Sequence, residues 1–321
     1  MYAYFTEPRR DEAAFRGLVE RSRASLANRS DDPRSVFGDS ANAILGGYSI
    51  RRTGANLSKL AQLDLDKALR IYNERFADAS AFTFTFVGSL DVAAIKPLLV
   101  KYLGGLPSTH AGEQAKDLGI HIPGGTMEKI IYKGTEPRAT VYMVLSGAFD
   151  YNSNDVTSLD ALKEVLQIRM IERLREDESG VYSPAVRVST EKFPRGRYYM
   201  AINFGCAPQN ADKLVASALD EIAKVRKDGP LQANIDKWRA EAKAGHETAV
   251  KTNGFWLNYL SGQLEEMEDL HEVDRYSERL DQVTVGRLRD AARKYLSGEN
   301  YIRLELLPAD ATGSSGGSGP K

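Results

Sequence analysis

The chain has 321 residues, 42% of them hydrophobic and 27% charged, a composition typical of a globular protein that buries a sizeable core. Its 43 basic and 44 acidic side chains give a formal net charge of -1, which argues against nucleic acid or an anionic membrane as the main partner, because both require a concentrated excess of Lys and Arg. No apolar run approaches the roughly 20 residues of a membrane span, and a single cysteine, Cys206, excludes an internal disulfide bond.

The N-terminal third of the chain is predicted to be mainly helical. The segment Glu12–Ala27 places its apolar residues on one face at helical spacing. Further helices are predicted after Asp32, Asp64 and Asp91, because a short acidic side chain before an apolar-periodic segment accepts hydrogen bonds from the free N–H groups of the first turn. Residues 81–87 (AFTFTFV) alternate aromatic side chains with threonine, and this pattern predicts a strand.

A polar stretch rich in Gly and Pro, residues 105–125, is the best candidate for a boundary between domains. We therefore predict a first domain at residues 1–110, a linker at 111–125 and a second domain at 126–308. The remaining residues, 309–321, are rich in Gly and Ser and predict a disordered tail.

The second domain is predicted to combine strands and helices. Strands are predicted at 127–133, 139–147, 181–189, 197–205 and 301–307, and helices at about 155–175, 209–226, 231–250, 254–268 and 284–296. Because the strands fall in pairs and the helices in runs, we predict an α+β fold with helices packed on one face of a mostly antiparallel sheet. A strand, Gly turn and helix also occur in this order before the linker, which suggests two homologous domains, although any such unit gives the same pattern.

The spacing of the histidines does not suit a metal site. A zinc hydrolase needs two histidines about one helical turn apart, a third ligand and a carboxylate that activates the bound water. Three of the four histidines begin such a motif, but another residue stands where the second histidine is needed: Val250 after His246, Arg275 after His271 and Gln114 after His110. We therefore predict that this chain has no metal ligand, no cofactor and no catalytic residue, and that it does not cleave peptides by itself.

Other catalytic patterns are also missing from the sequence. Cys206 follows Gly205 at a predicted strand end, and no neighbouring residue would activate its thiol, so we expect a structural cysteine. Outside the Gly/Ser-rich tail, neither the G-x-S-x-G pattern of serine hydrolases nor the G-x-x-x-x-G-K pattern of phosphate-binding loops occurs.

The most informative stretch is LREDESGVYS, which contains Arg175 and Tyr182. A long predicted helix ends here in a charged cluster, Gly180 allows the chain to reverse, and Tyr182 opens the next predicted strand. This geometry can bring Arg175 and Tyr182 to one surface, where a guanidinium and a phenol could bind a peptide carbonyl or carboxylate. A structural interpretation stays open, because an arginine near a helix C-terminus also interacts favourably with the helix dipole and a tyrosine at a strand start often packs.

Several sequence segments resemble those of one family, the pitrilysin/insulinase zinc peptidases, and in particular those of its bacterial "zinc protease" branch. LREDESGVYSPAV resembles the "LRE…G-x-Y-S" signature of the C-terminal half of these enzymes. RFADASAFTFTFVGSLDVAAIKPLLVKYLGGLPS resembles their strand and helix with G-[DS]-x-D, ending in "KY-x-G-x-LP", and TEPRR, NGFWLNYL and AARKYLSGENYIRLELLP are similar to further segments. The resemblance extends from about residue 5 to Pro308.

The resemblance implies four homologous α+β domains in two halves that close around a chamber, with zinc held in the first domain. It places residues 1–110 in the later part of the third domain and 126–308 in the fourth, so the first of our two sheet-plus-helices domains is expected to be incomplete. In the family, an Arg and a Tyr separated by six residues hold the substrate backbone near the zinc. Arg175 and Tyr182 have this spacing, so the resemblance implies that they bind substrate.

The same resemblance implies the partners and the location of the parent protein. The partners would be a peptide substrate and the zinc-bearing N-terminal half, and relatives of this branch suggest a periplasmic parent. The segment MYAYFTEPRR lacks the apolar core of a secretory signal, and we expect Met1 to be an added start on a fragment. The alternative is a non-catalytic scaffold or partner subunit of the same family.

Overall fold

The computed structural model describes residues 1–112, 114–181 and 183–313. The chain forms two compact units, each assembled from segments that are distant in sequence. The helical unit comprises Met1–Arg29, Ala55–Lys116 and Glu247–Leu270. The sheet unit comprises Ser30–Gly54, Asp117–His246 and His271–Lys321. None of the helices in the described part of the chain combines the length and the apolar character that crossing a membrane demands.

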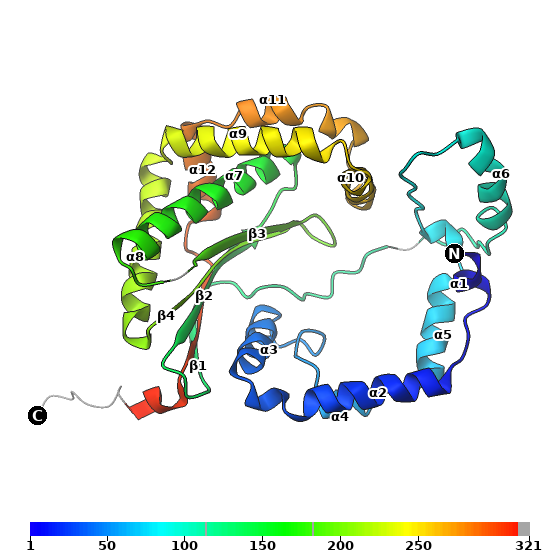
Figure 1. Cartoon of the computed structure of the whole chain (residues 1–321), viewed down its shortest axis with the longest axis horizontal. Helices are drawn as coiled ribbons and strands as arrows, with labels where there is room; N and C mark the ends of the chain where they lie inside the picture. The colour runs from blue at the N-terminus through cyan, green and yellow to red at the C-terminus, as the bar shows by residue number, and fades with distance from the viewer. Residues whose placement is uncertain (113, 182, 314–321) are drawn as a thin grey trace, which may run out of the picture. The chain divides into compact units, whose positions relative to one another are not determined.

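The sheet unit is built on a five-stranded sheet with the strand order β1-β5-β2-β4-β3 (Figure 1). Its strands are β1 (Thr126–Tyr132), β2 (Ala139–Ala148), β3 (Ala185–Glu191), β4 (Arg197–Cys206) and β5 (Tyr301–Leu307). β1 runs parallel to β5, and the other neighbouring strands are antiparallel. The predicted α+β fold with a mostly antiparallel sheet is therefore confirmed.

One face of the sheet is covered by three helices, α7 (Ser153–Met170), α8 (Ala211–Asp228) and α12 (Val285–Tyr295) (Figure 1). Side chains of α7 and the strands form the main core here, and its fully buried members include Leu162, Leu166, Met143, Met200 and Ile202. Two further helices complete this side of the unit, α9 (Gln232–Ala249) and the short α11 (Tyr276–Asp281). The sequence analysis predicted a helix at the position of α9, but none at the position of α11.

The opposite face of the sheet carries α3 (Pro33–Leu45), which packs against β5 (Figure 1). The predicted cap is present, since the Asp32 carboxylate accepts hydrogen bonds from the N–H groups of Arg34 and Ser35. Ile44 lies against Ile302 and other small or branched residues of the sheet in a second, smaller core. Helices therefore lie on both faces of the sheet, whereas the sequence analysis predicted helices on one face.

The strand β3 begins at Ala185, later than the predicted start at residue 181. The preceding Pro184 has no N–H group to donate to a strand ladder. The Gln167 side chain of α7 binds the backbone here, because its Nε2 donates to the Pro184 carbonyl (2.8 Å) and its Oε1 accepts from the Val186 N–H (2.8 Å). The chain is thus attached to α7 immediately before the ladder starts.

The helical unit contains the helices α1 (Tyr2–Thr6), α2 (Glu12–Ala27), α4 (Leu57–Leu60), α5 (Leu65–Phe76), α6 (Val92–Tyr102) and α10 (Asn253–Glu265). The predicted caps Asp64 and Asp91 both accept hydrogen bonds from first-turn N–H groups. Only Leu60 and Leu106 are buried among the described residues of this unit. Its helices therefore cover one another only in part.

The predicted strand at residues 81–87 is not formed. A 3-10 turn, Ala79–Ala81, is followed by residues without regular secondary structure. Phe82 packs its ring against Phe5 and Phe76, with centroid distances of 5.0 and 5.2 Å. A strand requires a second strand to pair with its N–H and C=O groups, and the described part of the helical unit contains none. The alternation of aromatic residues with threonine is therefore not enough to form a strand here.

Candidate functional site

The end of α7 carries Arg175, one of the two predicted substrate contacts. The helix continues into a π-helical turn, Ile171–Asp177. This geometry is rare in proteins overall, but where it occurs it is often at a functional site. Its last hydrogen bonds run from the Glu178 N–H to the Arg173 carbonyl (3.2 Å) and from the Gly180 N–H to the Leu174 carbonyl (3.0 Å). Because Leu174 is fully buried, this turn is anchored in the core.

The chain reverses after this turn, as predicted, but the glycine has a different role from the one expected. Ser179 adopts the positive φ of 49°. A Cβ atom on Gly180 would lie only 2.7 Å from Cδ2 of Leu214 on α8. Gly180 is therefore required because the backbone approaches α8 closely, and not because of its own backbone conformation.

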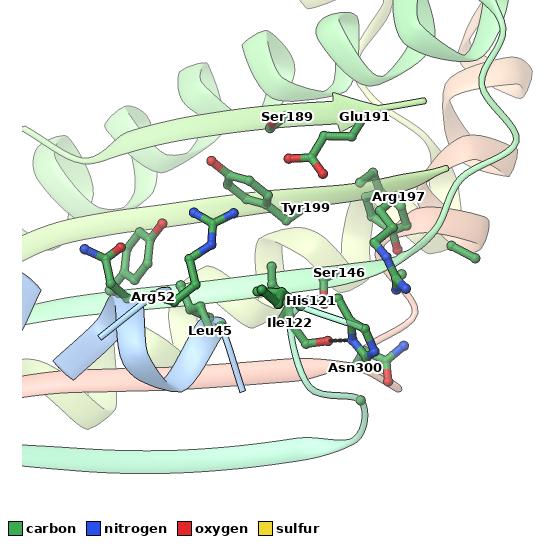
Figure 2. Close-up of a pocket in the computed structure, with 18 residues that line it drawn as sticks. Leu45, Arg52, His121, Ile122, Ser146, Ser189, Glu191, Arg197, Tyr199 and Asn300 are labelled. Carbon is green, nitrogen blue, oxygen red and sulfur yellow. Dashed lines mark hydrogen bonds between the residues drawn. The ribbon is translucent and has the colours of Figure 1, made fainter. Parts of the chain in front are cut away.

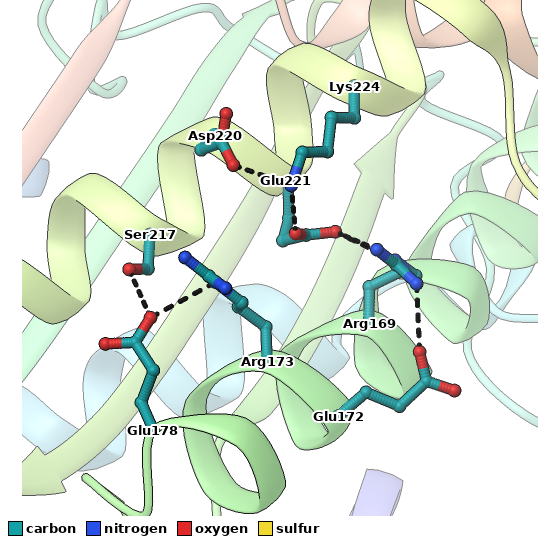
Figure 3. Close-up of polar contacts among 8 residues, drawn as sticks. All are labelled: Arg169, Glu172, Arg173, Glu178, Ser217, Asp220, Glu221 and Lys224. Atoms are coloured by element: carbon teal, nitrogen blue, oxygen red, sulfur yellow. Dashed lines mark hydrogen bonds and ion pairs between the residues drawn. The ribbon is translucent and has the colours of Figure 1, made fainter.

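Glu178 attaches the helix end to α8 (Figure 3). Its side chain is only 7% exposed, accepts a hydrogen bond from the Ser217 hydroxyl, and forms ion pairs with Arg173 (3.1 Å) and Lys213 (3.0 Å). Burial alone would raise the pKa of Glu178, but the hydrogen bond from Ser217 and the charge of Lys213 outweigh burial and hold the pKa below its ordinary value. The carboxylate is therefore ionised at neutral pH.

A second polar cluster joins the same two helices one turn earlier (Figure 3). Nε of Arg169 donates to Oε2 of Glu221 (2.8 Å), and Glu221 is almost completely buried. Arg169 also pairs with Glu172 (3.0 Å), while Lys224 donates to the other oxygen of Glu221 (2.9 Å). A buried carboxylate with two cationic partners is a well-satisfied arrangement, so the end of α7 has a fixed position on α8.

Arg175 differs from these residues. Its side chain is exposed and forms no hydrogen bond or ion pair with another residue that the structure describes. Residues two apart on a helix do not face the same direction, so Arg173 points to α8 and Arg175 does not. Tyr182 lies outside the described residues, and its proximity to Arg175 stays a prediction.

His246 and His271, which begin two of the incomplete motifs, contact other side chains. The ring of His246 lies against Tyr276, with centroids 4.5 Å apart. Nδ1 of His271 lies 3.2 Å from Oδ2 of Asp274, and both side chains are exposed. Among the residues that the structure describes, no group of three His, Cys, Asp or Glu side chains could hold a metal ion. These residues do not fit a zinc site.

Cys206 lies in the main core at the end of β4. Burial, with a smaller contribution from the Glu305 carboxylate, raises the pKa of its thiol to about 11, against the opposing effect of Arg138. A thiol with this pKa is protonated at neutral pH and is a poor nucleophile. The expected structural role of Cys206 agrees with this environment.

The structure also contains a cavity of about 330 Å³ that the sequence analysis missed. It lies on the face of the sheet that carries α3, and its lining includes Arg52, Tyr142, Tyr199 and Arg197. These residues come from segments far apart in sequence and form no motif, so only the folded chain reveals them.

Comparison with known proteins gives one family match and several relatives. A family model described as the peptidase M16 inactive domain matches residues 62–241. A "Zinc protease PQQL-like" from Arabidopsis thaliana is 26% identical over 275 residues, which covers 80% of this chain and 29% of that protein. A "Probable zinc protease PqqL" from Escherichia coli is 22% identical over 255 residues, 78% of this chain and 27% of that protein.

The crystal structure of the periplasmic protease PqqL from Escherichia coli has the same fold. It matches with a TM-score of 0.82 at 20% sequence identity, over 93% of this chain and 33% of that chain. This chain therefore spans about a third, or less, of the length of these relatives.

Proposed function

This chain belongs to the peptidase M16 family, whose inactive domain it contains, and from this premise we propose that it is the larger part of the C-terminal, non-catalytic half of a zinc metalloendopeptidase that encloses and degrades peptides. The relatives are described as zinc proteases and are about three times longer. In the proposed parent enzyme, residues 1–110 derive from a third domain, residues 111–125 form a linker, and residues 126–308 derive from the fourth domain. The compact units exchange two segments relative to this division, because Ser30–Gly54 belong to the sheet unit and Glu247–Leu270 to the helical unit. This half supplies a wall of the chamber.

Arg175 and Tyr182 are the proposed substrate contacts. The observation that carries this proposal is the state of Arg175, which is exposed and lacks an ionic partner among the described residues, on a helix end that Glu178 and Glu221 fix to α8. A preorganised guanidinium can donate two parallel hydrogen bonds to a carbonyl or carboxylate of a peptide at a small entropic cost. The Tyr182 hydroxyl would donate a further hydrogen bond to the substrate backbone.

The zinc ion of the proposed enzyme would belong to the N-terminal half. The histidines of this chain do not fit a zinc site, so the chain contributes positioning and electrostatic stabilisation. Its partners would be that N-terminal half and the peptide substrate. Because the Escherichia coli structure is described as a periplasmic protease, we propose a periplasmic location for the parent protein.

Co-expression of this chain with the N-terminal half of its parent protein, as two separate polypeptides, tests the proposal. We expect cleavage of a fluorogenic peptide by the mixture, no cleavage by this chain alone, and no stoichiometric zinc in this chain by metal analysis. Cleavage by this chain alone that a chelator abolishes would contradict the proposal. Full cleavage by the N-terminal half alone would instead favour the scaffold alternative.

A further inference from the structure

The cavity in the sheet unit has the features of a binding site (Figure 2). Its floor is formed by β2 and β4 with Tyr142 and Tyr199, and its wall by the end of α3 and by residues 120–124. The side chains of Leu45 and Ile122 give this wall an apolar part. A volume of about 330 Å³ lies at the lower end of the range of ligand pockets. The cavity can therefore hold a short stretch of peptide.

Two arginines of the lining, Arg52 and Arg197, have no ionic partner among the residues that the structure describes. Arg52 follows α3, and its stem fills the space beside Gly46, where an added Cβ atom would lie 2.3 Å from Cβ of Arg52. Arg197 begins β4 opposite Glu191 of β3. Neither guanidinium forms a hydrogen bond or ion pair with another described residue, and Figure 2 shows the Arg52 side chain reaching toward Tyr199.

Several arginines on the other side of the same sheet are engaged with acceptors. There, Arg169 pairs with Glu221, Arg303 pairs with Glu305, and Arg239 donates to two backbone carbonyls. An arginine that stays unpaired beside a cavity keeps its donors available for a ligand. The unpaired arginines therefore mark this cavity as a place for an anion.

The two tyrosines add neutral donors to the same cavity. Neither the Tyr142 nor the Tyr199 hydroxyl forms a hydrogen bond with another described residue. Burial, with a smaller effect of Tyr199, raises the pKa of Tyr142 despite the opposing charge of Arg187. The Tyr142 phenol thus keeps its proton and can donate to a ligand oxygen.

We propose that this cavity binds a carboxylate of a peptide. Arg52 and Arg197 give two positive charges and Glu191 one negative charge, so the cavity matches a monoanion better than a phosphate dianion, which Glu191 would repel. A planar carboxylate also fits the fork of an arginine. Leu45 and Ile122 would contact the aliphatic part of the same peptide. The carboxylate is either the C-terminus of a peptide or the side chain of an Asp or Glu.

Isothermal titration calorimetry on the whole chain tests this with three short N-acetylated peptides. One peptide, acetyl-Ala-Ala-Ala-Leu, has a free C-terminus, the second is its amide, and the third is an amide with a central Glu. We expect the first or the third to bind, which identifies the source of the carboxylate, and the neutral amide to bind at least about tenfold more weakly, because charged hydrogen bonds are lost. Equal binding of all three peptides, or no binding of either anionic peptide, would overturn the proposal.

Variants then test the assigned residues. Arg52→Gln and Arg197→Gln should each weaken binding of the anionic peptide about tenfold or more, and added salt should reduce the difference. The matched control is Arg289→Gln on α12, on the other face of the sheet, and it should bind like the wild type. Wild-type affinity in both cavity variants would contradict the assignment. If a variant fails to fold, the comparison of the three peptides on the wild-type chain still decides the question. A negative result there would contradict carboxylate binding in the cavity but would not affect the roles proposed for Arg175 and Tyr182.

Discussion

The helical unit and the sheet unit both contain helices of 11 residues or more, but these helices differ greatly in the number of side chains that they bury. In the sheet unit, α7 alone buries eight residues against the strands and its neighbouring helices. In the helical unit, none of α2, α5, α6 and α10 has a buried residue, and side chains such as Val92 and Val100 are 73% and 65% exposed. The comparison shows that a paired sheet, rather than helix formation, provides the core of this protein.

This difference predicts that the two units have different stabilities. Burial of apolar surface is the dominant favourable term in folding, and units with few buried contacts open at a lower free energy than a core. Each unit has its own tryptophan, Trp238 in the sheet unit and Trp256 in the helical unit. Variants that keep only one tryptophan therefore report the unfolding of one unit.

The largest expected effect comes from truncating a core leucine. Leu166→Ala in α7 should lower the free energy of unfolding of the sheet unit by about 2–5 kcal/mol, because a fully buried side chain leaves a cavity. Leu98→Ala in α6 is the matched control, since Leu98 is 54% exposed, and it should cost less than about 1 kcal/mol. Urea denaturation followed by the single tryptophan of each unit measures both changes. Equal costs would contradict the contrast between the units.

The sequence predicted those features of the fold that depend on neighbouring residues. The caps at Asp32, Asp64 and Asp91 are local interactions, and all three are present. Whether residues 81–87 form a strand depends on a pairing strand elsewhere in the chain. The local alternation of side chains does not show whether such a partner exists. The packing of α3 on the sheet of much later residues is likewise a non-local property.

The site could be predicted only in part, for the same reason. Arg175 is a candidate from the sequence because the charged helix end and Gly180 are adjacent in the chain, and its role in binding substrate stays a proposal. The ion pairs that hold this helix end involve Glu221 and Lys213 on α8, and no local pattern identifies them. The cavity brings Arg52 together with Arg197, which only the folded sheet unit can do.

A smaller effect is expected from the contact that attaches α7 to α8. Glu178→Gln should lower the free energy of unfolding of the sheet unit by about 1–2 kcal/mol at pH 7, since it removes charged hydrogen bonds whose partners Lys213 and Arg173 are partly exposed. Because the folded-state pKa of Glu178 is lowered, its contribution is fully present above the unfolded-state pKa and disappears as the pH falls through the folded-state pKa. The difference between wild type and variant should therefore begin to shrink below the ordinary glutamate pKa of about 4.3 and continue to shrink as the pH falls further. A constant difference down to pH 2 would show that the charge is not responsible.

The smallest expected effect is a change in the rate at which Cys206 is labelled when the helical unit unfolds. This rate tests whether the two units unfold separately. Its buried thiol, with a pKa of about 11, should react slowly with iodoacetamide at pH 7. At urea concentrations that change only the Trp256 signal, labelling of Cys206 should stay as slow as in water, because the sheet unit remains closed. Rapid labelling under these conditions would show that the two units open together.

The most direct test of the proposed function is the kcat/KM for a fluorogenic peptide of the enzyme assembled from both halves. Arg175→Lys and Tyr182→Phe should each lower kcat/KM by about tenfold or more, because each loses a hydrogen bond that would stabilise the bound substrate and the transition state. The control Arg289→Lys should retain wild-type kcat/KM, and the free energy of unfolding of the sheet unit should be unchanged in the Arg175 and Arg289 variants. Wild-type kcat/KM in both Arg175→Lys and Tyr182→Phe would contradict the proposed role of this chain in binding substrate.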